Sequence, residues 1–79
     1  MRTKILSPQG ITFEGEASLF NVQTEMGEVT ILDHHHPLIA ILKPGASRLI
    51  TTSGEEKNYS IDGGFLEVSD DNQLTVLIN

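Results

Sequence analysis

Short runs of alternating apolar and polar residues follow one another along the chain, and turn residues interrupt them every eight to twelve positions or so. One clear run has Leu74, Val76 and Ile78 alternating with Gln73 and Thr75. An alternation with period two places apolar side chains on one face of a strand and polar side chains on the other. The pattern predicts an all-β fold, an antiparallel β-sandwich of about eight to ten short strands with no substantial helix.

Proline, glycine and acidic residues mark the predicted turns. These turns lie at residues 7–10, 25–28, 43–45, 52–55, 62–64 and 70–72. Between the first two, Ile11 and Phe13 are predicted to share one face of a strand. Gly15 is predicted to mark a bulge or bend that lets one long strand cross between the two sheets.

The segment 32–45, LDHHHPLIAILKPG, contains a strand that is apolar on both faces. Leu38, Ala40 and Leu42 lie on one face of that strand, and Ile39 and Ile41 lie on the other. A second apolar row also arises in two later strands, where Phe65 and Leu77 lie opposite the predicted core residues. Such a row is covered on both sides inside the fold, or it forms an exposed patch that binds another protein.

Length and charge narrow the possible functions. Seventy-nine residues make a single domain, 1–79, with a thin stability margin. A net charge of −6 argues against nucleic acid or anionic lipid as a partner. The chain has no cysteine, no apolar run long enough to span a bilayer and no signal-peptide core, so a cytoplasmic-type domain is expected.

The tract from Asp33 through His34 and His35 to His36 is the obvious metal candidate. In an extended strand, however, His34 and His36 point to one side and His35 to the other, and no distant residue supplies a clear further ligand. A polar loop or contact surface is the favoured interpretation, and we expect no metal.

Carboxylate pairs are the remaining chemical candidates. Asp62 and Glu67 flank a Gly-Gly turn, and Glu14 and Glu16 are two positions apart. A catalytic pair needs a nucleophile, a phosphate loop or an oxyanion motif nearby, and the sequence offers none. These charges are typical of solvated strand surfaces that discourage edge-to-edge pairing, so neither a catalytic site nor a cofactor site is predicted.

Several of these motifs together resemble one family, the N-terminal β-sandwich domain of the epsilon subunit of F-type ATP synthases (delta in mitochondria). The matching elements run in order through the chain: SPQG followed by FEG, GEV and IL before His35 and Pro37-Leu38, then LKPG, GGFLEV and TVL. Thr30, Asp33, His34 and His36 depart from the family pattern, and of the three histidines only His35 matches it.

The resemblance implies a non-catalytic subunit of the central stalk, the rotor. Such a subunit links the gamma subunit to the proteolipid c-ring and helps couple proton translocation to ATP synthesis. The sequence ends at Asn79, before the family's usual C-terminal helices, so neither their inhibitory role nor nucleotide binding is expected here. The implied location is the cytoplasmic face of a bacterial inner membrane, reached only through the complex.

The same resemblance implies an interface by position in the motif. The turn Met26, Gly27, Glu28 and Val29 would face the ring loops, His35 would lie near the junction of ring and gamma, and Ser7 with the run Leu38, Ile39, Ala40, Ile41 and Leu42 would face gamma. Two alternatives remain open. One is a free-standing interaction module with another partner, and the other is a small metal-dependent protein that uses the histidine tract.

Overall fold

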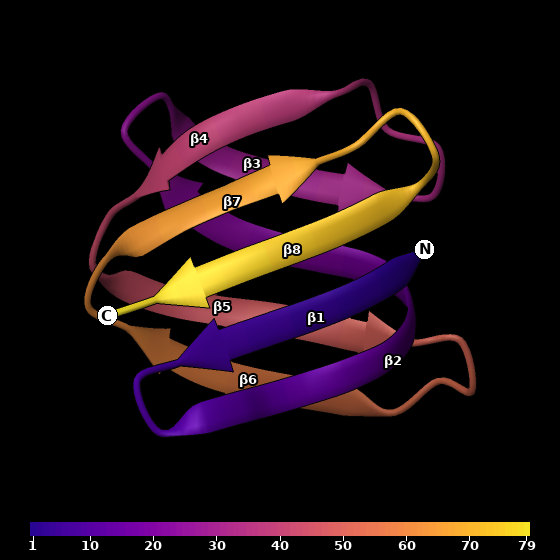
Figure 1. Cartoon of the computed structure of the whole chain (residues 1–79), viewed down its shortest axis with the longest axis horizontal. Helices are drawn as coiled ribbons and strands as arrows, with labels where there is room; N and C mark the ends of the chain where they lie inside the picture. The colour runs from indigo at the N-terminus through magenta and orange to yellow at the C-terminus, as the bar shows by residue number, and fades with distance from the viewer.

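Eight β-strands and no helix make up the computed structural model, which describes residues 1–79 throughout (Figure 1). The strands are β1 (Arg2–Ser7), β2 (Gly10–Thr24), β3 (Gly27–Leu32), β4 (Leu38–Leu42), β5 (Gly45–Thr51), β6 (Glu56–Ile61), β7 (Gly64–Val68) and β8 (Gln73–Ile78). The predicted all-β fold is confirmed, and each predicted turn falls between two strands.

Two layers of strands face each other, and β2 belongs to both. Its first half pairs with β1, which continues through β8 and β7 to β4, and its second half pairs with β3 and β5, with β6 beyond β5. Figure 1 shows the first layer, with β7, β8 and β1, in front of β5 and β6. All pairs are antiparallel except β1 and β8, which run parallel. The fold is therefore a mostly antiparallel sandwich.

A bulge early in β2 makes one predicted face assignment wrong. Ile5 is paired with Phe13 and Leu6 with Ile11, which leaves Thr12 as an extra residue in β2. Because the extra residue shifts the alternation by one, Phe13 packs against the core while Ile11 is 60% exposed. The two side chains do not share a face.

Strand β2 is the predicted long strand that crosses between the sheets, but its second irregularity does not lie at Gly15. Gly15 pairs regularly with Thr3, and a Cβ atom there would lie 3.3 Å from the ring of Phe13. The register shift lies between Ala17 and Leu19. The next core residue of β2 after Ala17 is Phe20, three positions along the strand. In a regular strand these two side chains would point to opposite faces, and the register shift brings both of them to the core.

The core lies between the two layers and draws on every strand. It contains Met1, Ile5, Ala17, Phe20, Val22, Ile31, Ala40, Leu42, Leu49, Ile61, Leu66, Val68, Leu74 and Val76. Phe20 is its largest fully buried side chain, on the half of β2 that lies between β3 and β5. Burial of these apolar side chains supplies most of the stability of a sandwich this small.

The connecting turns gather at two opposite ends of the sandwich. One end, here called the Met26 end, holds the turns 8–9, 25–26, 43–44 and 62–63 together with the C-terminus. The other, the His35 end, holds Met1 and the loops 33–37, 52–55 and 69–72. Figure 1 shows the N- and C-termini on opposite sides of the molecule.

Candidate functional site

A row of apolar side chains crosses the outer face of the first layer, here called the outer row. Each member is paired in register with the next on the adjacent strand. In order from β4 through β7, β8 and β1 to β2, the outer row is Ile41, Phe65, Leu77, Leu6 and Ile11. Since paired residues point to the same side of a sheet, the five side chains form one continuous stripe.

The outer row is open to solvent in this chain. Ile41 is 57% exposed, Phe65 is 49% exposed and Leu77 is 36% exposed. Ile39, two positions along β4 on the same face, is 71% exposed. The second apolar row of β4 is therefore not covered from within the fold, and of the two possibilities raised by the sequence the exposed patch holds. A contiguous apolar patch of this kind marks an interaction surface.

The outer face of the second layer has a different character. Its central row runs from Thr30 through Asn21 and Arg48 to Asn58. The Asn21 amide donates hydrogen bonds to Thr30 Oγ1 and to a carboxylate oxygen of Glu28, both over 2.9 Å. This face is polar and hydrogen-bonded, so an apolar partner is expected to bind the first layer.

Charged side chains border the outer row on the side facing the His35 end. The next row on the same face runs from Glu67 through Thr75 and Lys4 to Glu14. Glu14 lies 3.7 Å from the Lys4 ammonium and 3.4 Å from the Arg2 guanidinium. These surface ion pairs add little stability, but they give the border of the apolar row a defined charge pattern.

The turn predicted to face the ring is ordered by a threonine. Thr24 Oγ1 accepts a hydrogen bond from the backbone N–H of Met26 and donates one to the carbonyl oxygen of Gly27, over 3.1 and 2.8 Å. The Met26 side chain is 70% exposed at the tip. Glu28 lies on the polar outer face of the second layer, and Val29 packs against the core.

The remaining predicted interface residues divide by face. Ala40 and Leu42 are buried and Leu38 packs against the core, so only Ile39 and Ile41 of this strand reach the outer surface. Ser7 lies at the Met26 end, where its hydroxyl donates to Gln9 Oε1 over 3.2 Å.

His35 lies at the other end of the sandwich from the Met26 turn and from Ser7. Its Nδ1–H donates to the carbonyl oxygen of His36 over 2.8 Å, and the two rings meet edge to face with centroids 6.4 Å apart. No three His, Cys, Asp or Glu side chains come together as ligands for a metal ion. The histidine tract is thus a loop that does not assemble a ligand set.

Asp33 ties this loop to the N-terminus. Its carboxylate accepts hydrogen bonds from the Met1 ammonium and from the Asn72 side-chain amide, and the Asn72 side-chain oxygen Oδ1 accepts one from the backbone N–H of His34 over 2.7 Å. The bond from the Met1 ammonium is the main cause that lowers the pKa of Asp33 below its ordinary value of 3.8. The ammonium also donates to the carbonyl oxygen of Ala17 over 2.7 Å.

This ion pair makes stability depend on pH. Because the pKa of Asp33 is lower in the folded state, its contribution is complete above the unfolded value and is lost as the pH falls through the folded one. We expect Asp33→Asn to lower the free energy of unfolding at pH 7. The difference in free energy of unfolding between the variant and the native chain should shrink as the pH falls from 5 to 3. Urea unfolding at pH 7 and at pH 3 measures this difference, with Asp70→Asn as the control. A difference in free energy of unfolding that is equal at pH 7 and at pH 3 would show that Asp33 does not act through its charge.

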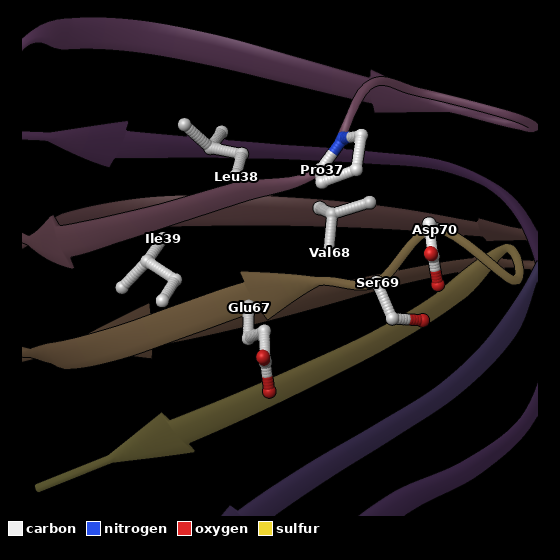
Figure 2. Close-up of a pocket in the computed structure, with 7 residues that line it drawn as sticks. All are labelled: Pro37, Leu38, Ile39, Glu67, Val68, Ser69 and Asp70. Carbon is white, nitrogen blue, oxygen red and sulfur yellow. The ribbon is translucent and has the colours of Figure 1, made fainter.

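The largest surface hollow lies where β4 begins and β7 ends, with a volume of about 530 Å³. Figure 2 shows Leu38 and Val68 pointing to one side of the paired strands and Ile39 and Glu67 to the other. Glu67, Ser69 and Asp70 supply its polar lining, and no basic side chain joins them. The hollow is open to solvent and does not form a cradle for a small ligand.

Comparison with known proteins identifies the fold. The family described as "ATP synthase, Delta/Epsilon chain, beta-sandwich domain" matches residues 1–79. The chain belongs to this family. Its eight strands and two layers are therefore those of the delta/epsilon β-sandwich.

Curated relatives carry matching names. The chain is 44% identical over 68 residues to the ATP synthase epsilon chain of Clostridium novyi, a match that covers 86% of this chain and 52% of the relative. It is 42% identical over 74 residues to the mitochondrial ATP synthase subunit delta of Yarrowia lipolytica, covering 94% and 46%. The chain thus spans about half the length of these relatives.

Solved structures share the fold at low sequence identity. A chain in the Euglena gracilis mitochondrial ATP synthase, determined with OSCP, F1 and c-ring, matches with a TM-score of 0.91 and 22% identity over 99% of this chain and 49% of that one. A chain of the Tetrahymena thermophila central stalk and c-ring assembly matches with a TM-score of 0.83 and 20% identity, covering 99% and 62%. This chain has no helix that is long and apolar enough to cross a bilayer.

Proposed function

We propose that this chain is the β-sandwich part of a non-catalytic rotor subunit in the central stalk of an F-type ATP synthase. It binds the gamma subunit and the c-ring and helps transmit torque between proton flow and ATP synthesis. Family membership and relatives named as epsilon and delta subunits support the assignment. In this proposal the protein works at the cytoplasmic face of a bacterial inner membrane and reaches it only through its partners.

The single observation that carries the proposal is the exposed outer row. Three members of one apolar stripe, Ile41, Phe65 and Leu77, lie on one face of a family member whose opposite face is polar. Removing such apolar surface from water contributes about 25 cal/mol per Å² before the costs of association are subtracted. The outer row is therefore the proposed gamma-binding surface, and Ile39 extends it.

The proposed contact with the c-ring lies at the Met26 end. Met26 is the most prominent exposed apolar side chain among the turns of that end, and Thr24 fixes the backbone beneath it. A methionine on a rigid turn adapts its flexible side chain to a partner loop at low conformational cost. Ser7 lies at the same end of the sandwich as Met26, whereas His35 lies at the opposite end and does not share this surface.

One substitution tests the gamma contact. We expect Ile41→Glu to weaken binding of gamma at least about tenfold, because a carboxylate would be taken out of water without a partner. Ile41 is exposed in the free domain, so the free energy of unfolding should change by less than about 1 kcal/mol. Co-purification and titration calorimetry with gamma measure the affinity, and urea unfolding measures the stability.

The matched control introduces the same residue on the other side of the molecule. Asn58→Glu lies on the exposed outer face of the second layer and should leave gamma binding unchanged. If Ile41→Glu folds normally and binds gamma with native affinity, the outer row is not the gamma surface. If the native chain shows no binding to gamma at micromolar concentration, the stalk assignment itself fails and a free-standing module with another partner takes its place.

A further inference from the structure

The outer row has an arrangement that suits a second copy of the same chain. Its centre is Leu77 on β8, with β7 and β1 at equal distances on either side and β4 and β2 beyond them. Consider a second copy placed face to face, related by a two-fold axis that runs along β8. The axis exchanges β7 with β1 and β4 with β2, so each row on this face lies opposite itself in reverse order.

This exchange produces matching contacts along the apolar stripe. Leu77 lies opposite Leu77 of the second copy, Phe65 lies opposite its Leu6, and Ile41 lies opposite its Ile11. Two sheets that pack with aligned strands bring such rows together across about 10 Å. The outer rows of the two copies therefore contact each other through apolar side chains along their whole length.

The charged border provides an independent observation. In the next row Glu67 on β7 and Lys4 on β1 lie one strand either side of Thr75. The same axis places Glu67 opposite Lys4 of the second copy, and Lys4 opposite its Glu67, so both pairs have opposite charge. Ile39 then faces Glu14 of the second copy at the rim, where Glu14 keeps Arg2 and Lys4 of its own chain as neighbours. Charge complementarity of this kind fixes the register of an interface.

From these two observations we propose that the domain forms a two-fold symmetric dimer through the outer face of β4, β7, β8, β1 and β2. The face spans five strands about 4.8 Å apart and two to three side-chain rows, about 400–500 Å² per copy. A total of about 900 Å² is below the usual size of a stable interface, so the dimer is weak and transient. The dimer covers the outer row whenever no larger partner does.

Sedimentation equilibrium between 10 μM and 1 mM tests the proposal on the chain 1–79 alone. We expect a monomer–dimer equilibrium that Leu77→Lys weakens at least about tenfold, since it places two ammonium groups opposite each other on the axis. Glu67→Lys should weaken the dimer about threefold or more, and the double variant with Lys4→Glu should restore the native Kd within about twofold. Asn58→Lys, on the opposite outer face, is the matched control and should change nothing.

Each possible result decides the question. A chain that stays monomeric to 1 mM, a dimer that Leu77→Lys leaves intact, or a double variant no better than Glu67→Lys alone would overturn the proposal. Thermal unfolding at 5 μM, where the monomer predominates, shows that each variant is folded. The experiment contains no gamma subunit, so its outcome is separate from that of the stalk assignment.

Discussion

Gly64→Ala is expected to unfold the domain or bring it close to unfolding. Gly64 has a φ angle of +132°, and a Cβ atom there would lie 1.9 Å from the carbonyl oxygen of Leu77 and 3.0 Å from the Cα atom of Ile78. Both neighbours are backbone atoms of β8, which is held between β7 and β1. Relief of the overlap therefore requires the β7–β8 pair to separate at its Met26 end. A 79-residue domain has about 4–12 kcal/mol of stability in total, and the loss of this pairing takes most of it.

A second glycine provides the control for this experiment. Gly54, in the loop between β5 and β6, also has a positive φ angle, +94°, but a Cβ atom added there would meet no other atom within 4 Å. Gly54→Ala carries only the backbone strain, about 1–3 kcal/mol, and should stay folded. Urea unfolding followed by circular dichroism compares the two variants. Equal losses of unfolding free energy in Gly64→Ala and Gly54→Ala would show that the contact with Leu77 is relieved without cost.

The sequence predicted the strands and turns well because each depends on local chemistry. Alternation along β8 and the two-faced pattern of β4 follow from the pleat alone. The structure places Ile41 and Leu42 on opposite faces, as the alternation predicts, and it is Ile41 that points outward. Of the Gly63-Gly64 pair, which was assigned to a turn, Gly63 lies in the turn and Gly64 begins β7. The reason why position 64 requires glycine is the close approach of β8. That approach depends on a strand paired across the sheet, so it could not be deduced from the local sequence.

Bulges account for the main error. A single extra residue at Thr12 reverses the alternation, so Ile11 joins the exposed outer row and Phe13 joins the core. Neither Thr12 nor Ser18 carries a glycine or proline signal, and the one glycine in this strand that suggested a bulge, Gly15, pairs regularly. Bulge positions are set by how β2 fits two sheets at once, which is a property of the assembled layers.

The candidate surface required register as well as alternation. Ile41, Phe65 and Leu77 were each recognisable as apolar residues on the non-core side of a strand. Their alignment in one stripe depends on strand order, which places β4 beside β7 and β8 beside β1. Leu6 was missed as a member although its outward position follows from the buried Thr3 and Ile5 of the same strand.

The neighbours Leu66 and Phe65 on β7 separate stability from binding. Leu66 is fully buried, and Leu66→Ala should lower the free energy of unfolding by about 2–5 kcal/mol because it leaves a cavity between the layers. Phe65 is the larger side chain but is 49% exposed, so Phe65→Ala should cost about 1 kcal/mol. Urea unfolding at low protein concentration, where the outer face is free, measures both values.

The order of the two variants should reverse in a binding experiment. Phe65 lies in the outer row between Ile41 and Leu77, and an aromatic side chain in the centre of an apolar contact often contributes about 2 kcal/mol or more to affinity. We expect Phe65→Ala to weaken binding of gamma about 30-fold, whereas Leu66→Ala should bind normally at temperatures where it is folded. A large stability loss for Phe65→Ala together with native affinity would mean that its ring supports the fold and not a partner. The opposite result identifies β7 as a strand whose two faces serve separate purposes, one for the core and one for the complex.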